Sequence, residues 1–434
     1  MSHRMIGLLS CIIVGCATPG AVWAAGAVYA MTNALGNNEV VAYHRASDGT
    51  LTLMQTTGTG GGGSGIQLDP TDSLGSQGGL VLNQSHHLLF AVNTESLAED
   101  RRDGTDIGDC EEGTISSFVV AADGTLTLAD KMPSGGLFPA SLAVHGKLLY
   151  VLNAGGPGLD PVCGIGPNIT GFEVGQDGSL SALADSTQPL DPGSSPGSFL
   201  SCDPGVGPLP TDEFRCGLNP PAFPRSPGQI GFTPDGRALV VTVKGSNSIY
   251  AFPLDHGGRP GAPSTSRAAG PYQPTYFGFA FDKKGHLVVS EPFGTTPVIP
   301  AVPFSAVSSF SITRDGALQA ISSSVPNGRG TACWVVLDPS ERYAYTANNA
   351  TSDISTYALH KDGSLTLLES EAADADLPND MAVARDHGSR FLYVLNSGNG
   401  TVGVFRIDDD GSLTSLGAVG GLPVDAGAQG LAAY

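Results

Sequence analysis

The sequence predicts an all-β fold, a seven-bladed β-propeller whose blades each contain four antiparallel strands. Two observations carry this prediction. A phrase of short apolar strands and tight turns returns seven times at a spacing near 50 residues, which is typical of propeller blades. The chain also contains 60 Gly and 31 Pro among 434 residues but only 14% charged residues, and no stretch has the apolar pattern of an amphipathic helix.

The second half of each repeat predicts a pair of outer strands joined by a turn that contains glycine. Asp-Gly between alternating apolar residues is a strong hairpin signal, because glycine tolerates the positive φ that such turns need. Two copies, 248–262 and 307–321, are weaker than the rest. The five clear copies are VVAYHRASDGTLTL (40–53), ISSFVVAADGTLTL (115–128), ITGFEVGQDGSLSAL (169–183), ISTYALHKDGSLTLL (354–368) and VGVFRIDDDGSLTSL (402–416).

The first half of each repeat predicts the two inner strands, here named A and B from the channel outward, with C and D for the outer pair. Alternating apolar residues and β-branched side chains support each of them. In blades two to seven, the expected A and B strands are 79–83 and 88–93, 141–144 and 148–153, 229–232 and 238–243, 277–281 and 287–291, 334–337 and 343–348, and 381–384 and 391–396.

The two ends of the chain predict how the ring closes. The first strand, 28–33, has the character of a B strand, and the last segment, 429–434, has the character of an A strand with nothing after it. We therefore expect blade one to take its innermost strand from the C-terminus, which leaves no open sheet edge.

The N-terminal residues 1–25 predict a signal peptide. His3 and Arg4 precede an apolar run over 5–15, and small residues up to Ala25 offer a cleavage site. A lipoprotein signal is the alternative, because Gly15 precedes Cys16. We expect residues 26–434 to form the propeller, in a periplasmic or secreted protein or in one that is lipid-anchored through Cys16.

The net charge of −20 and the pI near 4.6 disfavour a nucleic-acid partner, because binding phosphates requires clustered Lys and Arg. An acidic surface also keeps an exported protein soluble, so we expect a monomer. The expected partner is a small-molecule ligand, and a protein or glycan partner is the alternative.

The long connections all join strand B to C or strand D to the next A, so antiparallel topology places them on one face of the ring. They are 58–76, 94–113, 154–168, 187–226 and 292–306. Loops of this length are usually functional or disordered, and we expect them to cap one mouth of the channel. Two disulfides are expected within them, Cys202 with Cys216 and Cys110 with Cys163, while Cys333 lies in an apolar strand as a buried thiol.

Candidate site residues follow from which strand ends meet at this mouth. Five B strands end in Asn, and these side chains are predicted to fix the B–C turns. In the other two blades, Lys244 and Glu291 stand at the same position. Glu291 is either an acid or base or the partner of a cation such as Arg225 or Arg267. The nine His lie at turns on the other face or in the N-terminal segment, which disfavours a Ser-His-Asp or His-rich metal site. Residues just before A strands are Gly79, Ser141, Gln229, Tyr276, Cys333, Asp380 and Gly430.

The acidic segment 99–112 is the one candidate cation site. Asp103, Asp106 and Asp109 follow one another at three-residue intervals and offer hard oxygen ligands for calcium. A solvated acidic loop is the structural alternative. No other cofactor is expected.

Several phrases of the chain resemble the lactonase family of seven-bladed propellers, which includes propeller-type 6-phosphogluconolactonases and fungal carboxymuconate-lactonising enzymes. They are LGSQGGLVL (74–82), LLFAVN (88–93), LLYVLN (148–153), TPDGRALVVT (233–242) and the DGSLT turns. The resemblance covers the mature chain. It implies His, Arg and Glu at the channel mouth of active members; 227–232, 273–279 and 328–334 contain no His, and Glu291 resembles the family's B-strand Glu.

The resemblance implies a lactonase-like hydrolase, or a cycloisomerase, acting on a small lactone or organic acid. In the hydrolase, water attacks the lactone carbonyl with Glu291 or Asp380 as base, while Arg225 or Arg329 counters the developing negative charge. The residues expected to contact the ligand are Ser141, Gln229, Lys244, Tyr276 and Cys333. The alternative is a non-catalytic binding or scaffold propeller that recognises a protein or glycan.

Overall fold

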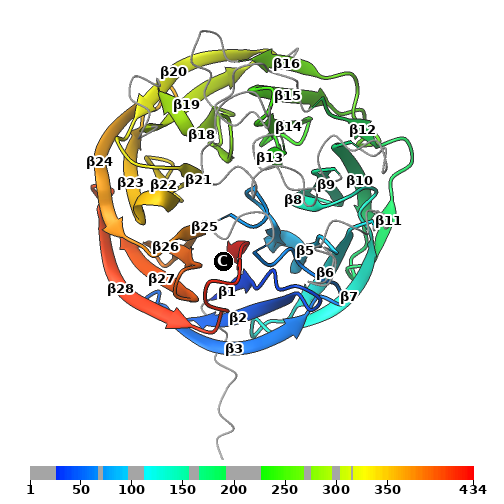
Figure 1. The fold of residues 1–434 in the computed structure, drawn as a ribbon, viewed down its shortest axis with the longest axis horizontal. Helices are drawn as coiled ribbons and strands as arrows, with labels where there is room; N and C mark the ends of the chain where they lie inside the picture. Colours follow the sequence, from blue (N-terminus) through cyan, green and yellow to red (C-terminus); the bar gives the residue numbers. More distant parts are fainter. Residues whose placement is uncertain are drawn as a thin grey trace, which may run out of the picture.

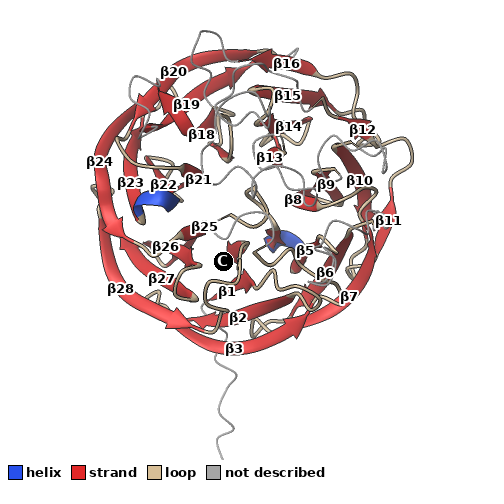
Figure 2. Cartoon of the chain, viewed as in Figure 1, coloured by secondary structure: helices blue, strands red, loops and turns tan. Residues whose placement is uncertain are grey.

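A computed structural model describes residues 26–66, 72–95, 112–155, 166–191, 226–267, 275–295, 304–313 and 316–434. Seven antiparallel sheets stand around a central axis, as predicted (Figure 1). Figure 2 shows strands throughout, and the helical residues of these ranges are two short 3-10 turns, η1 (Gln84–His86) and η3 (Asn349–Thr351). In these same ranges, no helix has the length and apolarity needed to cross a membrane.

The inner two strands of each blade surround the channel. The A strands of blades one to seven are β29 (Leu431–Ala433), β4 (Leu80–Asn83), β8 (Pro139–His145), β13 (Pro227–Phe232), β17 (Phe279–Phe281), β21 (Ala332–Leu337) and β25 (Pro378–Asp386). The B strands are β1 (Gly26–Met31), β5 (Leu88–Asn93), β9 (Leu148–Asn153), β14 (Ala238–Val243), β18 (Leu287–Thr295), β22 (Tyr343–Asn348) and β26 (Ser389–Asn396).

The outer two strands complete each blade. The C strands are β2 (Glu39–Arg45), β6 (Thr114–Val120), β10 (Asn168–Val174), β15 (Ser248–Pro253), β19 (Phe304–Ile312), β23 (Asp353–Leu359) and β27 (Thr401–Ile407). The D strands are β3 (Leu51–Gly58), β7 (Leu126–Pro133), β11 (Leu180–Ala182), β16 (Ser264–Arg267), β20 (Leu318–Pro326), β24 (Leu365–Asp374) and β28 (Leu413–Gly420). In blade three a further short strand, β12 (Gln188–Pro189), also pairs with β10.

The ring closes between the two ends of the chain, as the sequence predicts. Strand β29 pairs antiparallel with β1, with Tyr29 opposite Ala432. The Tyr434 amide donates to the Ala27 carbonyl over 3.0 Å, and the Arg45 guanidinium donates to the Tyr434 carbonyl over 2.9 Å. Blade one therefore has four strands only because the last residues return to the first.

The core lies between neighbouring blades rather than at a single centre. Every residue of β5 is buried, whereas in β7 at the rim only Leu126 is buried and the other residues are exposed or partly exposed. Between blades three and four, Tyr150 and Leu152 pack with Val241 and Phe252. Each sheet thus buries both faces of its inner strands against its neighbours, which explains their almost unbroken apolar character.

A recurring hydrogen bond connects the Asp-Gly turns to the preceding blade. The Tyr345 hydroxyl of blade six donates to the Gly411 carbonyl of blade seven over 2.9 Å. Tyr29, Tyr150 and Tyr393 make the same bond to Gly124, Gly258 and Gly49. Gly411 is required for two reasons. Its φ is positive, and a Cβ at this position would lie 2.5 Å from the Tyr343 ring.

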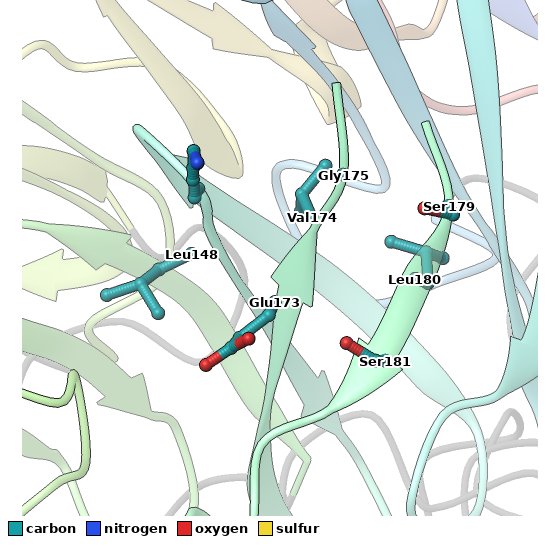
Figure 3. Close-up of a pocket in the computed structure, with 8 residues that line it drawn as sticks. Leu148, Glu173, Val174, Gly175, Ser179, Leu180 and Ser181 are labelled. Atoms are coloured by element: carbon teal, nitrogen blue, oxygen red, sulfur yellow. The ribbon is translucent and has the colours of Figure 1, made fainter. Parts of the chain in front are cut away.

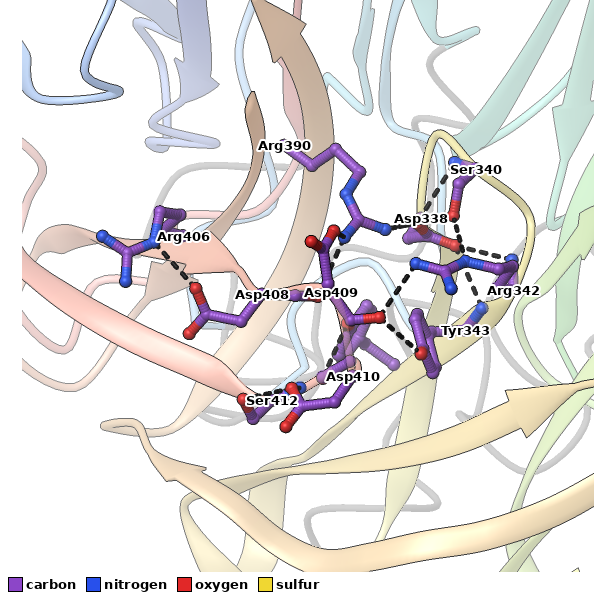
Figure 4. A network of polar contacts seen from close by, with 12 residues as sticks. Asp338, Ser340, Arg342, Tyr343, Arg390, Arg406, Asp408, Asp409, Asp410 and Ser412 are labelled. Carbon is purple, nitrogen blue, oxygen red and sulfur yellow. Dashed lines mark hydrogen bonds and ion pairs between the residues drawn. The ribbon is translucent and has the colours of Figure 1, made fainter. Parts of the chain in front are cut away.

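Blades six and seven are also joined by a buried ion pair, shown in Figure 4. The Arg390 guanidinium donates to the Asp338 carboxylate over 2.7 Å and to the Asp408 carbonyl over 2.8 Å. Burial opposes ionisation of Asp338, but hydrogen bonds from Ser340, the Tyr343 amide and Arg390 outweigh it and hold the pKa of Asp338 below its usual range. The charged form of both residues is therefore part of the blade contact.

The connection between blades one and two enters the channel instead of capping its mouth. We call residues 72–79 the channel plug. The Gln77 side chain donates to and accepts from the backbone of Val335 over 2.9 and 3.1 Å, and the Gln77 amide donates to Gly228. The Ser76 hydroxyl donates to Ala140 over 2.7 Å. Because these partners belong to the A strands of three blades, the plug fills the channel they enclose.

The plug also explains why the A strand of blade five is shorter than expected. The sequence predicts a strand over 277–281, but β17 begins at Phe279. The Gly278 amide donates to the Cys333 carbonyl of the next blade over 3.2 Å, and a Cβ on Gly278 would lie 2.0 Å from the Gln77 side-chain oxygen. The backbone here bonds across to blade six and leaves room for the plug.

We predict that Gly411→Ala destabilises the propeller more than Gly388→Ala. Both glycines have a similar positive φ, +88° and +95°, but a Cβ at Gly388 meets no atom within 4 Å. The control therefore reports the backbone cost alone, about 1 kcal/mol, and Gly411→Ala adds the clash with Tyr343, about 1 to 3 kcal/mol more. Urea unfolding measures both, and equal losses of stability would contradict the prediction.

Candidate functional site

The Asn residues that end four B strands hold B–C turns, as the sequence predicts, whereas Asn33 lies beyond β1 and binds Ser64 and Gly427. The Asn348 side chain donates to Asp353 over 2.7 Å and to Ser355 over 2.8 Å, across the B–C turn of blade six. Asn93 makes the equivalent bonds to Thr114 and Ser116 in blade two. These side chains are buried and saturate local backbone and hydroxyl groups, which is a structural role.

Lys244 replaces this Asn in blade four and points toward the plug. Its side chain is 2% exposed, its ammonium donates to the Gly75 carbonyl, and Nζ lies 4.8 Å from the centre of the Phe277 ring. Burial lowers the pKa of Lys244 to about 8, although Asp72 and Cys333 nearby act to raise it. A lysine in this state carries its positive charge at neutral pH but loses it readily.

Glu291 replaces the Asn in blade five and is fully buried within that blade. It accepts hydrogen bonds from the Ser308 hydroxyl of β19 and, over 2.7 Å, from the Ser324 hydroxyl of β20. Burial raises the pKa of Glu291 to about 7, and the two hydroxyl donors only partly oppose it. The carboxyl group therefore changes protonation near neutral pH, which suits a general acid or base.

Asp380 lies at the inner edge of blade seven, in β25. It is 3% exposed, accepts from the Met381 amide over 2.8 Å, and accepts from the Leu431 amide of blade one over 3.1 Å. Burial raises the pKa of Asp380 to about 8, and the charge of Asp72 raises it further. At neutral pH this carboxyl is mostly protonated and can donate a hydrogen bond.

Ser141 and Gln229 occupy the same level of the channel and link one A strand to the next. The Ser141 hydroxyl donates to the Gln77 carbonyl over 2.6 Å and accepts from the Ile230 amide. The Gln229 side-chain oxygen accepts from the Phe279 amide over 2.6 Å. Tyr276 packs edge-on against Phe310. The expected ligand contacts are thus part of the blade and plug contacts.

Arg329 lies in the connection into blade six and contacts the outer part of that blade. Its guanidinium donates to Asp353 over 2.8 Å and pairs with Glu371 over 3.1 Å. The hydrogen bond to Asp353 raises the pKa of Arg329. These partners are different from the carboxyl groups that the sequence assigns to catalysis.

The structure therefore divides the predicted residues into groups. Lys244, Cys333 and Asp380 gather around the plug with Asp72, which sequence reasoning missed; Glu291 forms a second group with Ser308 and Ser324. The sequence LGSQGG (74–79) begins two residues after Asp72, but it does not show that this segment enters the channel.

Several expected residues lie outside the described residues. They are Arg225, the cysteines Cys110, Cys163, Cys202 and Cys216, and the acidic loop residues Asp103, Asp106 and Asp109. Within the part of the chain that the structure describes, no three His, Cys, Asp or Glu side chains are arranged to hold a metal ion.

A separate pocket of about 440 Å³ lies at the turns of blade three (Figure 3). It is lined by Lys147 and Leu148 of the A–B turn and by residues 173–175 and 179–181 around the C–D turn. Antiparallel topology places these turns on the face opposite to the channel mouth where the long connections lie. Among its lining residues Lys147 and Glu173 are the ionisable ones, and neither has the burial of Lys244 or Asp380.

Comparisons with known proteins agree with this architecture. The family model described as "Lactonase, 7-bladed beta-propeller" matches residues 263–379, and it confirms the expected resemblance to that family. Among curated proteins, no sequence match was found.

Solved structures share the fold at low sequence identity. A proposed 6-phosphogluconolactonase from Bacteroides uniformis is 15% identical with a TM-score of 0.64, covering 94% of this chain and 99% of its own. The periplasmic gluconolactonase PpgL from Pseudomonas aeruginosa is 18% identical with a TM-score of 0.62, covering 92% of this chain and 98% of its own. At such identities the likeness establishes the seven-bladed fold.

We predict that Glu291 makes folding stability fall as pH rises from about 4.5 to about 7. The native carboxyl keeps its proton up to about pH 7, whereas the unfolded one loses it near 4.5. Native protein therefore binds more protons in this window, and stability declines across it by up to about 3 kcal/mol. Urea unfolding of Glu291→Gln between pH 4 and 8 should show that this part of the decline is gone.

The matched control is Glu369→Gln, which changes an exposed glutamate on β24. It should keep the wild-type dependence on pH. Parallel stability curves for the wild type and Glu291→Gln would contradict the prediction.

Proposed function

We propose that this lactonase-like propeller hydrolyses a small lactone at the channel mouth that carries its long connections. One observation supports this more than any other. Four B strands end in Asn that hold turns, while the equivalent residues of blades four and five, next to each other, are Lys244 and Glu291, whose pKa values burial brings to about 8 and about 7. Ionisable groups tuned toward neutral pH are typical of catalytic sites.

The protonation states suggest a role for each group. Glu291 is ionised in part of the molecules at neutral pH, so it takes a proton from the attacking water. Asp380 is mostly protonated, so it donates a proton to the ring oxygen as the carbon–oxygen bond breaks. The Lys244 ammonium, now on the Gly75 carbonyl, stabilises the negative charge on the lactone carbonyl oxygen. The product is the open hydroxy acid.

The position of Lys244 makes it a better candidate for this electrostatic role than Arg329. The Arg329 guanidinium pairs with Asp353 and Glu371, and it is held by both. Lys244 faces the plug at the centre of the ring, close to Asp72 and Cys333. Arg225 remains a second source of positive charge in this proposal.

We predict that Asp380→Asn, Glu291→Gln and Lys244→Met each lower kcat/KM for the lactone by about 100-fold or more. A panel of aldonolactones with and without a phosphate group is assayed by proton release with a pH indicator. The control is Glu173→Gln, in the pocket of blade three on the opposite face.

Two outcomes would contradict lactone hydrolysis. Turnover that survives all three substitutions would remove these residues from the mechanism. Saturable ligand, protein or glycan binding without any turnover would favour the alternative, a binding propeller.

We propose further that the protein is exported. The support is the N-terminal sequence, a basic start, an apolar run and small residues before Gly26, together with a solved structure of the same fold that is described as periplasmic. We predict that mass spectrometry of the protein from its native host finds a chain that starts near Gly26, or one that starts at a lipid-modified Cys16. An intact chain starting at Met1 would contradict export by either signal.

A further inference from the structure

Asp72 opens the channel plug and is held in one place by hydrogen bonds. Its side chain is 5% exposed, and Oδ1 accepts from the Gly75 amide over 2.9 Å and from the Gln429 side chain over 2.9 Å. Gln429 precedes β29, so this contact joins the plug to the C-terminal strand 357 residues away.

Asp72 and Lys244 are connected through hydrogen bonds to one residue of the plug, Gly75. The Gly75 amide donates to Asp72, and the carbonyl of the same Gly75 accepts from the Lys244 ammonium. The turn that Asp72 closes thus also fixes the position of the lysine. Phe277 covers the ammonium at 4.8 Å, and Cys333 is the other ionisable group acting on it.

The C-terminal segment connects Asp72 to Asp380 in a similar way. Gln429 binds Asp72 with its amide nitrogen and the Leu74 amide with its oxygen, over 2.8 Å. Two residues later, the Leu431 amide donates to Asp380 over 3.1 Å. Three residues, 429–431, therefore hold both carboxyl groups in fixed relation, and Asp72 is the charged neighbour that acts on Asp380.

We propose that Asp72 is a positioning residue that couples the protonation of Lys244 to that of Asp380. The plug is then part of the functional site, in addition to filling the channel. The negative charge of Asp72 favours the ammonium form of Lys244 and the protonated form of Asp380. Both states are those that the proposed lactone hydrolysis uses, and this inference rests on that function for its catalytic meaning.

The coupling has a signature in stability that does not depend on activity. Below about pH 8, Asp72 attracts the ammonium and faces a neutral Asp380; above it, the attraction is lost and two carboxylates repel. Replacing Asp72 by Asn removes the charge and leaves an oxygen to accept both hydrogen bonds. The stability advantage of the wild type over Asp72→Asn should therefore shrink as pH rises through about 8.

Urea unfolding of the full chain between pH 6 and 10 measures this difference. We expect the pH dependence of the difference to vanish when the same substitution is made in the double variant Lys244→Met, Asp380→Asn. Asp123→Asn, at an exposed Asp-Gly turn, is the matched control and should shift the curve without changing its shape. A difference that is constant with pH, or one that persists in the double variant, would overturn the coupling.

The dependence of kcat on pH is a second measurement, and it distinguishes the coupling by Asp72 from the proposed lactone hydrolysis. In Asp72→Asn the high-pH limb of kcat against pH should move down by on the order of one unit, as expected for a unit charge several ångströms away at an effective dielectric near 20. Asp72→Glu should restore the wild-type limb. If the stability difference behaves as expected but no lactone is turned over, the coupling stands and the proposed function fails.

Discussion

The hydrogen bonds between the channel plug and the inner strands are the constraint on which the rest of the structure depends. Seven A strands turn their polar backbone edges toward one axis, where unpaired groups would be costly. Residues 72–79 supply partners to blades one, three, four and six through Leu74, Ser76 and Gln77. The same segment sets the position of Lys244 and carries Asp72 to the centre. Stability and the candidate site thus share one segment.

The blades differ in whether they keep a hydrogen bond between a B-strand Tyr and a glycine of the next blade. In blades one, three, six and seven, a B-strand Tyr donates to the glycine carbonyl of the next blade's Asp-Gly turn. The B strands of blades two, four and five contain no Tyr, and in blades four and five Lys244 and Glu291 stand where other blades have Asn. Two of these three blades therefore also bury an ionisable group near the end of strand B.

Much of the fold was accessible from the sequence because each blade repeats a local rule. Alternating apolar strands, Asp-Gly turns and complementary ends gave the blade count and the closure of β29 on β1. The plug was not accessible, because its partners lie 64 to 357 residues away and are mostly backbone groups that any sequence would offer. Asp72 was missed for that reason. Lys244, Glu291 and Asp380 could be singled out as candidates from the sequence because they break a repeat or stand at a predictable strand end.

The return of the last residues to the first strand has a consequence for how the molecule is made. Strand β29 and the Gln429 contacts to the plug both lie within the final six residues of the chain. A growing polypeptide can assemble the middle blades in order, yet its first sheet keeps an open edge until β29 has been synthesised. The ring can therefore close only after residues 429–434 have been made, and the centre of the molecule becomes organised in that same event.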